Sequence, residues 1–144
     1  MQTRQRLFAA FAFLSMSAGV AAQSVVRDLE ALSPATLAQD ELKTLLPGAT
    51  LTRVLSNGTT QWWQNDADGT FSISSDNRGT TNRHSSAYGK WHLPGDGRYC
   101  VLIEWRHSPV EEWCRFVIRS TSGYFLTRSV SSPTERVFAI KISK

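Results

Sequence analysis

Cysteine and histidine, residues that often hold metals or act in catalysis, are scarce: the 144-residue sequence has two cysteines and three histidines. His84, His92 and His107 lack the i, i+4 or short-loop spacing that favours a metal ion. The Gly-x-Ser-x-Gly turn that presents the nucleophile of α/β-hydrolases is absent as well. The sequence therefore predicts no metal site, no cofactor and no catalytic residue, and it favours a non-enzymatic protein.

Charge of one sign is also in short supply. The whole chain has a net charge of +4, and two of its positive charges are Arg4 and Arg6 near the start. The rest of the chain is therefore near +2, and its basic residues are scattered. This charge is too weak to indicate nucleic acid or anionic lipid as a partner. After position 22, no stretch is apolar enough to span a bilayer.

The segment 1–22 has the pattern of a cleavable secretory signal. Two arginines form a short basic region, and the stretch from Leu7 to Ala22 is almost wholly apolar or small. Small side chains at its end place the cleavage site before Gln23. A membrane anchor is the alternative, but it needs about 20 apolar residues, and this stretch is shorter. We expect a signal peptide over residues 1–22, export to the periplasm or the medium, and a single β-rich domain over residues 23–144.

Cys100 and Cys114 both lie in the part that we expect to be exported, where an even number of cysteines predicts a disulfide. Each lies in a strand-like run, and the segment between them contains the turn signal Ser108-Pro109. A hairpin centred on His107 would place the two cysteines opposite each other. The alternatives are a redox-active pair, whose cysteines usually sit two residues apart, or half of a metal site. The prediction is a structural disulfide across neighbouring strands.

One segment before the β-rich region predicts a helix. Ser33 is a good N-cap, Pro34 suits the first helical position, and Pro47-Gly48 would end the helix. Leucines recur between these limits at helical spacing, and we expect them to pack on a sheet. These leucines are Leu37, Leu42, Leu45 and Leu46. A helix that binds a partner is the alternative.

From residue 49 onward, about eight strand-like runs alternate with tight turns. Asn57-Gly58 is the strongest of the hairpin signals. The pattern predicts a mainly β fold: an antiparallel meander that forms a small barrel or a strongly curved sheet, with one N-terminal helix over an open face or one end. The polar stretch over residues 76–86 lacks apolar anchors, so we expect a mobile surface loop there.

Aromatic residues, in contrast, are plentiful, with five Trp, three Tyr and seven Phe. Successive strand residues point to opposite faces, so one of Trp62 and Trp63 should be buried and the other partly exposed. An outward indole beside Arg53, Arg78 or Arg83 would form a contact surface for a ligand or a protein. These five residues are the candidate binding site, and core packing is the alternative explanation of the aromatic content.

Two acidic clusters have ordinary explanations. The Asp-Ala-Asp-Gly run at 66–69 is similar to part of a calcium loop, but Ser75 stands where a bidentate glutamate is needed, so a plain turn is favoured. Glu104, Glu111 and Glu112 lie around the cysteine hairpin, and a pair of carboxylates could do acid-base chemistry. Charged residues beside a hairpin turn are usually solvated instead.

Several motifs follow one another in a characteristic order. They are DELKTLLPGATL, NGTTQWW, DADGTFSIS and YGKWHLPGDGRYCVLIEW, followed by the second cysteine and Gly123-Tyr124, and they cover most of residues 40–125. In this order the chain resembles a family of short exported proteins of Gram-negative bacteria, known as domain of unknown function 995. The resemblance implies a periplasmic or secreted β-rich protein and supplies no active site.

These observations favour an exported non-enzymatic binding module of the periplasm or the medium that engages a protein or a small ligand. One alternative is an inhibitor or immunity-type protein of a secreted hydrolase, whose hairpin at 106–110 plugs a partner's cleft. A small periplasmic hydrolase and a structural envelope protein are the others. An enzyme should bring His92 or His107 to Glu104 or an aspartate, whereas a binding module should show an apolar patch or a cavity.

Overall fold

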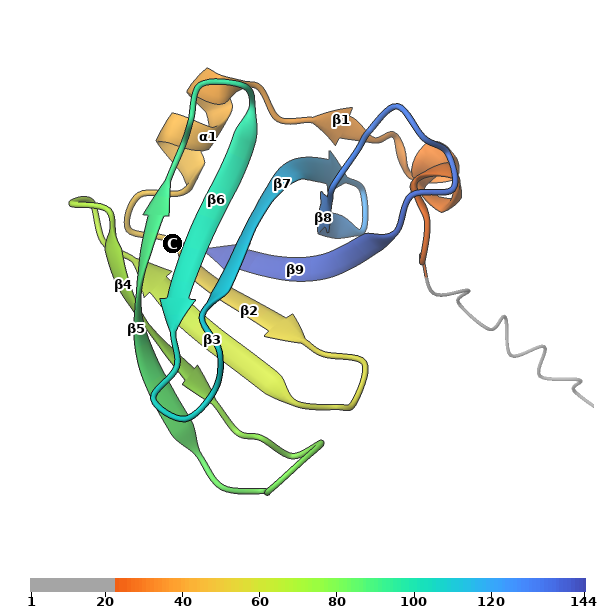
Figure 1. Cartoon of the computed structure of the whole chain (residues 1–144). Helices are drawn as coiled ribbons and strands as arrows, with labels where there is room; N and C mark the ends of the chain where they lie inside the picture. Colours follow the sequence, from red (N-terminus) through yellow and green to blue (C-terminus); the bar gives the residue numbers. More distant parts are fainter. Residues whose placement is uncertain (1–22) are drawn as a thin grey trace, which may run out of the picture.

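The structure is a computed structural model that describes residues 23–144. The signal peptide expected over residues 1–22 lies outside the described residues. Within them, a 3₁₀ helix and a short strand precede an α-helix, and eight further strands follow (Figure 1). In chain order the elements are η1 (Val26–Leu32), β1 (Ala35–Thr36), α1 (Gln39–Leu45), β2 (Thr50–Val54), β3 (Thr60–Asn65), β4 (Thr70–Ser75), β5 (Ser85–His92), β6 (Arg98–Glu104), β7 (Glu111–Ser120), β8 (Gly123–Thr127) and β9 (Val137–Ser143).

The strands β2 to β9 form a closed antiparallel barrel. Each of them pairs with the next strand in the sequence, from β2 with β3 through to β8 with β9. The last strand, β9, also pairs with β2, where Leu51 lies opposite Ile142. This pairing closes the sheet, and the short β1 is added beside the end of β7. The expected mainly β meander is confirmed, and it takes the form of a barrel.

Tight turns connect the first strands. In the Asn57-Gly58 turn between β2 and β3, Gly58 has a φ of 86°. Gly69, between β3 and β4, has a φ of 90°. Residues with a Cβ rarely adopt this conformation, so both turns depend on glycine. The carboxylate of Asp68 accepts hydrogen bonds from the backbone N–H and the hydroxyl of Thr70 at 3.0 and 2.6 Å, as an ordinary Asp-Gly turn requires.

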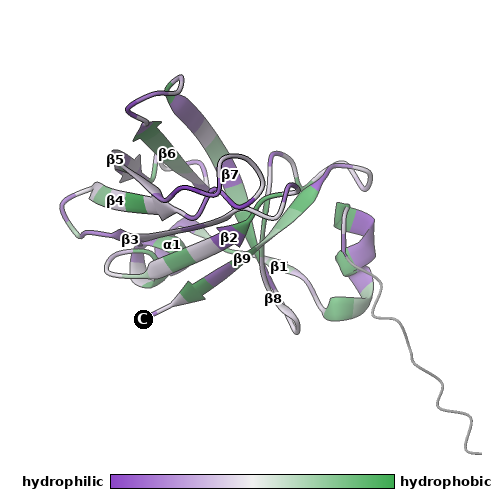
Figure 2. Ribbon diagram, turned by 90° about the horizontal axis from the view of Figure 1, so that it is seen from below, coloured by the Kyte–Doolittle hydropathy of each residue, from purple (hydrophilic) through white to green (hydrophobic). Residues whose placement is uncertain are grey.

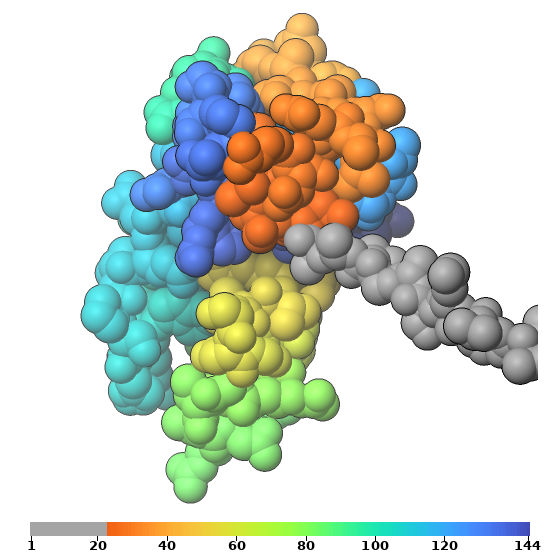
Figure 3. All heavy atoms as spheres, turned by 90° about the vertical axis from the view of Figure 1, so that its right-hand side faces the viewer, coloured from red at the N-terminus to blue at the C-terminus, as the bar shows by residue number. Residues whose placement is uncertain are grey.

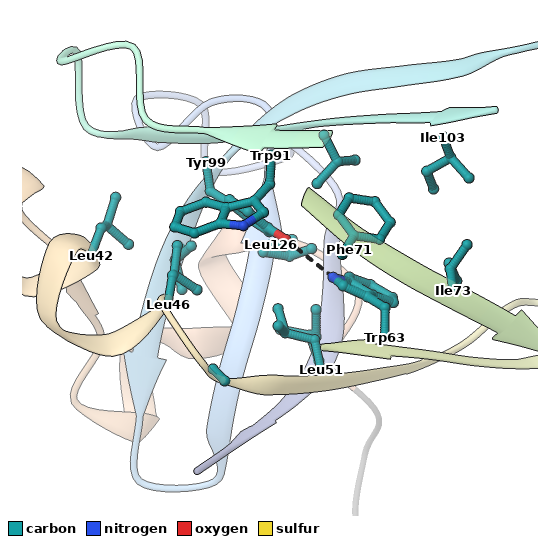
Figure 4. Close-up of a cluster of buried hydrophobic side chains, with 14 of the residues drawn as sticks. Leu42, Leu46, Leu51, Trp63, Phe71, Ile73, Trp91, Tyr99, Ile103 and Leu126 are labelled. Atoms are coloured by element: carbon teal, nitrogen blue, oxygen red, sulfur yellow. Dashed lines mark hydrogen bonds between the residues drawn. The ribbon is translucent and has the colours of Figure 1, made fainter. Parts of the chain in front are cut away.

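Inward-facing side chains fill the barrel. On β3, Trp63 and Asn65 are buried, whereas the intervening residue points outward. Figure 4 shows side chains from several strands meeting in the interior. The main core cluster consists of Leu37, Leu42, Leu46, Ala49, Leu51, Trp63, Phe71, Ile73, Ala87, Trp91, Tyr99, Val101, Ile103, Val117, Leu126 and Ile140.

The helix α1 lies across one end of the barrel (Figure 1). Leu42 and Leu46 are fully buried there, and Leu45 packs against the same core cluster. This confirms that the predicted leucine stripe packs on the sheet. Neither helix of the described part of the chain is long and apolar enough to cross a membrane.

The start of this helix differs from the prediction. Ser33 has a left-handed φ of 49°, so it does not cap the helix, and Pro34 lies outside it. The helix begins after Ala38, whose backbone N–H donates to Oε2 of Glu41 at 2.9 Å. The prediction was wrong because the intervening residues form β1, which pairs with β7 at the point where β6 no longer does. Tertiary pairing outweighs the local capping preference here.

The 3₁₀ helix η1 covers part of the outer surface of the barrel. Leu29 is fully buried in a second apolar cluster with Ile118, Phe125 and Val137, which lie on β7, β8 and β9. Figure 3 shows η1 (orange) against the connection between β8 and β9 (blue), and Figure 2 shows that η1 carries both hydrophobic and hydrophilic residues. The barrel therefore has an apolar core inside and a smaller one outside.

The hairpin of β6 and β7 contains the predicted disulfide. Cys100 and Cys114 lie directly opposite each other, and their sulfur atoms are bonded. On β6, the neighbours Tyr99 and Val101 face the main core. The disulfide therefore lies on the outer side of the hairpin, and both sides of these strands carry apolar or sulfur-containing groups, as expected.

Candidate functional site

A polar and aromatic cluster occupies the barrel end opposite α1. Arg53 of β2 and Glu111 of β7 form an ion pair there, with Nη2 of the arginine 2.6 Å from Oε1 of the glutamate. Nε of Arg53 also donates to Oε1 of Gln61 at 2.8 Å. The Arg53 side chain is only 16% exposed and that of Glu111 32%, so the pair is largely shielded from solvent.

Indole rings complete this cluster. Trp105 and Trp113 donate their Nε1–H groups to the two carboxylate oxygens of Glu111, at 3.2 and 3.1 Å. The guanidinium carbon of Arg53 lies 5.7 Å from the ring centres of both Trp63 and Trp113. A cation over an aromatic face is attracted by the ring quadrupole. The cluster therefore ties three strands and the β6–β7 turn together at this end of the barrel.

The electrostatics of Glu111 fit a structural role. Burial by itself raises the pKa of its carboxyl, but the hydrogen bond and positive charge of Arg53 and the two indole N–H groups outweigh this effect. The net pKa lies below the ordinary value of 4.5, so the group is ionised at neutral pH. A carboxyl that donates protons near neutral pH needs the opposite shift. Glu111 is suited to hold Arg53 and the indoles in place.

A hydrogen-bonded chain crosses the core. Nε1–H of Trp63 donates to the hydroxyl of Tyr99 at 3.1 Å, drawn as a dashed line in Figure 4, and this hydroxyl donates to Oδ1 of Asn65 at 3.0 Å. Burial raises the pKa of Tyr99 to about 12. The phenol therefore stays neutral and links two buried polar groups of β3 to β6.

The candidate binding residues from the sequence fall into two groups. Trp63 is buried in the core, and Arg53 lies beside it inside the barrel. Trp62, the neighbouring indole, points outward and is 37% exposed. The expectation of one buried and one partly exposed tryptophan is confirmed, but Arg53 does not share the outer face with Trp62, because Arg53 and Trp62 face opposite sides of the sheet.

The other two candidate arginines belong to the loop over residues 76–84 that borders Trp62. His84 of this loop lies edge-on to the Trp62 ring, with ring centres 6.4 Å apart. Arg78 is exposed and forms an ion pair with Asp76 at 3.5 Å. The side chain of Arg83 is exposed as well. The structure thus brings the loop that carries Arg78 and Arg83 next to Trp62.

A second exposed aromatic residue lies on the same outer surface. Tyr88 of β5 is 78% exposed. Across the strands, Trp62 lies opposite Ser74 and Ser74 opposite Ser86, while Tyr88 lies opposite Ser72. We call these five residues the outer aromatic face: two exposed rings with three serines between and beside them. Sequence reasoning missed Tyr88, although the alternation of small and large residues on its strand could have revealed its outward direction.

A hollow of about 340 Å³ adjoins Tyr88 on the outside of the barrel. Its lining includes Asp66, Ser72, Lys90 and Glu104, so both charge signs are present. Gly89 forms part of its floor. Because Gly89 lacks a side chain, the ring of Phe71 packs against its backbone from the core side. The hollow therefore extends the outer aromatic face with hydrogen-bonding groups.

A larger groove of about 610 Å³ runs between α1 and the ends of β7 and β8, with Lys144 at its rim. Leu37, Leu45 and Tyr124 form its apolar part. Polar groups at its rim already have partners: Arg119 pairs with Glu41 at 3.3 Å, and Nζ of the last residue donates to the backbone oxygen of Thr44. This groove is the place where the alternative of a partner-binding helix would apply.

The histidines lie apart from one another. His92 is exposed opposite Cys100, and His107 is exposed in the turn between β6 and β7. Within residues 23–144, no group of three or more His, Cys, Asp or Glu side chains is arranged to hold a metal ion. The acidic run at 66–69 forms the turn described above.

Comparison of the chain with protein-family models, with curated proteins and with solved structures finds no match. The resemblance to domain of unknown function 995 stays a prediction. Function must therefore be argued from the site itself.

Proposed function

We propose that the chain is an exported, non-enzymatic binding module whose ligand lies on the outer aromatic face. The observation that carries this proposal is the exposure of Trp62 and Tyr88 on one side of the sheet, with only serine side chains on the strand between them. Exposed Trp and Tyr rings offer much contact area and lose little conformational freedom on binding. Neither ring is needed to fill the core of the barrel.

Export is supported by two features. The segment 1–22 has the pattern of a secretory signal, and the disulfide of the β6–β7 hairpin is of a kind that persists in oxidising compartments. We expect the exported form to begin at Gln23. The mass of the protein recovered from the periplasm or the medium measures this, and a form that retains the segment 1–22 would contradict export through a cleaved signal.

Affinity capture tests the binding surface. Immobilised wild type, Trp62→Ala and Tyr88→Ala are exposed to a periplasmic extract, with Val110→Ala as the control. Val110 is also exposed, at 59%, but lies at the β6–β7 turn. We expect a component that wild type and the control recover and that both aromatic variants lose. Equal recovery by all four proteins would reject the outer aromatic face. Trp63→Ala is unsuitable here because this side chain fills the core.

One observation favours a second candidate function, the inhibitor or immunity-type protein. The β6–β7 turn carries the exposed Val110 and lies at the tip of a hairpin that the disulfide joins. A tip of this kind can enter the cleft of a partner. The same experiment separates the two: loss of a captured protein by Val110→Ala alone would favour the hairpin tip.

A further inference from the structure

We infer that the ligand of the outer aromatic face is an uncharged, β-linked glycan chain that lies across β3, β4 and β5. This inference rests on the proposed binding function and names the ligand class of the same site. It follows from the chemistry of the exposed groups, from their spacing and from the charge balance around them.

The rings are spaced for an extended ligand. Trp62 and Tyr88 lie two strands apart and are offset by two residues along the strands, since Trp62 is level with Ser74 and Tyr88 with Ser72. With neighbouring strands about 4.8 Å apart and about 3.4 Å per residue, the two Cα atoms are about 12 Å from each other. A single small ring cannot contact both aromatic side chains at this distance. A chain of linked rings can.

The groups between and beside the rings suit a sugar. The faces of aromatic rings carry partial negative charge, which attracts the slightly positive C–H groups on the flat side of a β-linked pyranose. The hydroxyls of Ser72, Ser74 and Ser86 form no hydrogen bond within residues 23–144. These small side chains do not cover the two rings, although His84 lies edge-on beside Trp62. They are free to pair with sugar hydroxyls, which need partners once water is displaced.

The adjoining hollow adds further unused groups. The side chains of Asp66, Lys90 and Glu104 line it and form no ion pair or hydrogen bond within the described residues. Tyr88 lies near Lys90 and Glu104 along the surface, since Tyr88 is opposite Glu104 and Lys90 follows on the same strand. These groups can donate to and accept from the hydroxyl and amide groups of a sugar. Around the outer aromatic face, the three negative charges of Asp66, Asp76 and Glu104 match the three positive charges of Arg78, Arg83 and Lys90. The site therefore favours neither an anionic nor a cationic ligand.

Other ligand classes fit less well. A peptide that adds a strand needs an unpaired sheet edge, and the closed pairing of β2 to β9 leaves none along β3, β4 or β5. An amphipathic helix needs an apolar groove, whereas serines lie between the two rings. A nucleic acid needs a basic surface, whereas the acidic and basic side chains around this face are equal in number. An uncharged ligand with ring faces and hydroxyls remains.

Binding of soluble oligosaccharides tests this inference. The exported form is titrated with N-acetylated chito-oligosaccharides and with cello-oligosaccharides while tryptophan fluorescence and heat are recorded, and its retention on insoluble chitin and cellulose is measured. We expect wild type and Val110→Ala to bind at least one of the two. Trp62→Ala and Tyr88→Ala should each weaken binding by at least about tenfold, as loss of a central aromatic contact does. Trp62→Phe should keep part of the affinity.

Thermal unfolding of each variant shows whether it is folded. We expect both alanine variants to be folded, because the Trp62 and Tyr88 side chains point outward. Failure of wild type to bind any of these glycans would overturn the inference, as would equal binding by the two alanine variants. The capture experiment distinguishes failure of the glycan inference from failure of the proposed binding function. A captured protein that the aromatic variants lose would leave the binding module in place with a different ligand.

Discussion

Glu111 shows how much one residue contributes to the barrel end opposite α1. Its carboxylate accepts from Arg53 and from the indoles of Trp105 and Trp113, so a single side chain connects β2, β7 and the turn after β6. Removal of this carboxylate costs folding free energy, because its three donors then lack an acceptor in a place that is shielded from solvent.

Glu111→Gln should lower the free energy of unfolding by about 1–2 kcal/mol at neutral pH. The folded pKa of Glu111 lies below its unfolded value of 4.5, so its contribution is present above that value and is lost as the pH falls through the folded pKa. The difference in stability between wild type and variant should therefore shrink below about pH 4.5. Urea denaturation at several pH values measures this. Glu112→Gln, at an exposed neighbouring position, is the control, and a pH-independent difference would contradict the assignment.

Gly89 is a position where a single methyl group has no room. A Cβ there would collide with the ring of Phe71 and with the backbone oxygen of Leu102. We expect Gly89→Ala to lower the free energy of unfolding by about 1–3 kcal/mol, because overpacking forces neighbouring groups to move. Phe71→Leu should lower the free energy of unfolding by less in the Gly89→Ala background than in wild type. Strictly additive losses in this double-mutant cycle would exclude a contact with the ring.

Like β1, the element η1 was not defined by the sequence. Its residues have mixed character, and only Leu29 is buried. The partners of Leu29 come from strands far along the chain, and the backbone N–H groups of Val26 and Arg27 donate to the backbone oxygens of Glu135 and Pro133. No local pattern contains that information. The element forms because the outer faces of β7, β8 and β9 carry apolar side chains that need a cover.

Leu29→Ala should therefore destabilise the protein by about 3 kcal/mol, the usual cost of a cavity at a fully buried leucine. Glu30→Ala changes the exposed neighbour and should leave stability within about 0.5 kcal/mol of wild type. Chemical denaturation of the two variants gives both values. If both variants were as stable as wild type, η1 would not be packed on the barrel in solution.

The strands and turns were predictable from the sequence because their signals are local. Alternation at Trp62-Trp63, glycine in the turns and the equal distance of both cysteines from His107 each indicated a feature that the structure confirms. The start of α1 was not predictable, since β1 forms only by pairing with β7, a strand much later in the chain. The outer aromatic face was found in part: Trp62 was predicted, while its neighbour Tyr88 comes from another strand and depends on the register.

At the scale of the whole molecule, the disulfide joins the two halves of a central hairpin. The cysteines are 14 residues apart in the sequence. In the chain-entropy picture, a loop of about 15 residues stabilises the folded state by about 3 kcal/mol. The barrel has its own core, so we expect it to fold without this bond, with reduced stability.

Replacement of both Cys100 and Cys114 by alanine should therefore lower the unfolding free energy by about 3 kcal/mol while the circular dichroism of the folded state is kept. Addition of a reductant should have a similar effect on wild type and none on the double variant. Mass spectrometry of the exported wild type should find no free thiol. Two free thiols, or a reductant effect on the double variant, would contradict the disulfide's role.

The pairing of β9 with β2 has a consequence for the order of events in the cell. The ladder remains an open sheet until residues 137–143 are available, so a chain that lacks them carries two unpaired edges, β2 and β8. Open edges recruit other strands, and a chain cut short before β9 would expose β2 and β8 to aggregation. In the export that we propose, β9 would cross the membrane after the other strands, and the barrel would close on the far side.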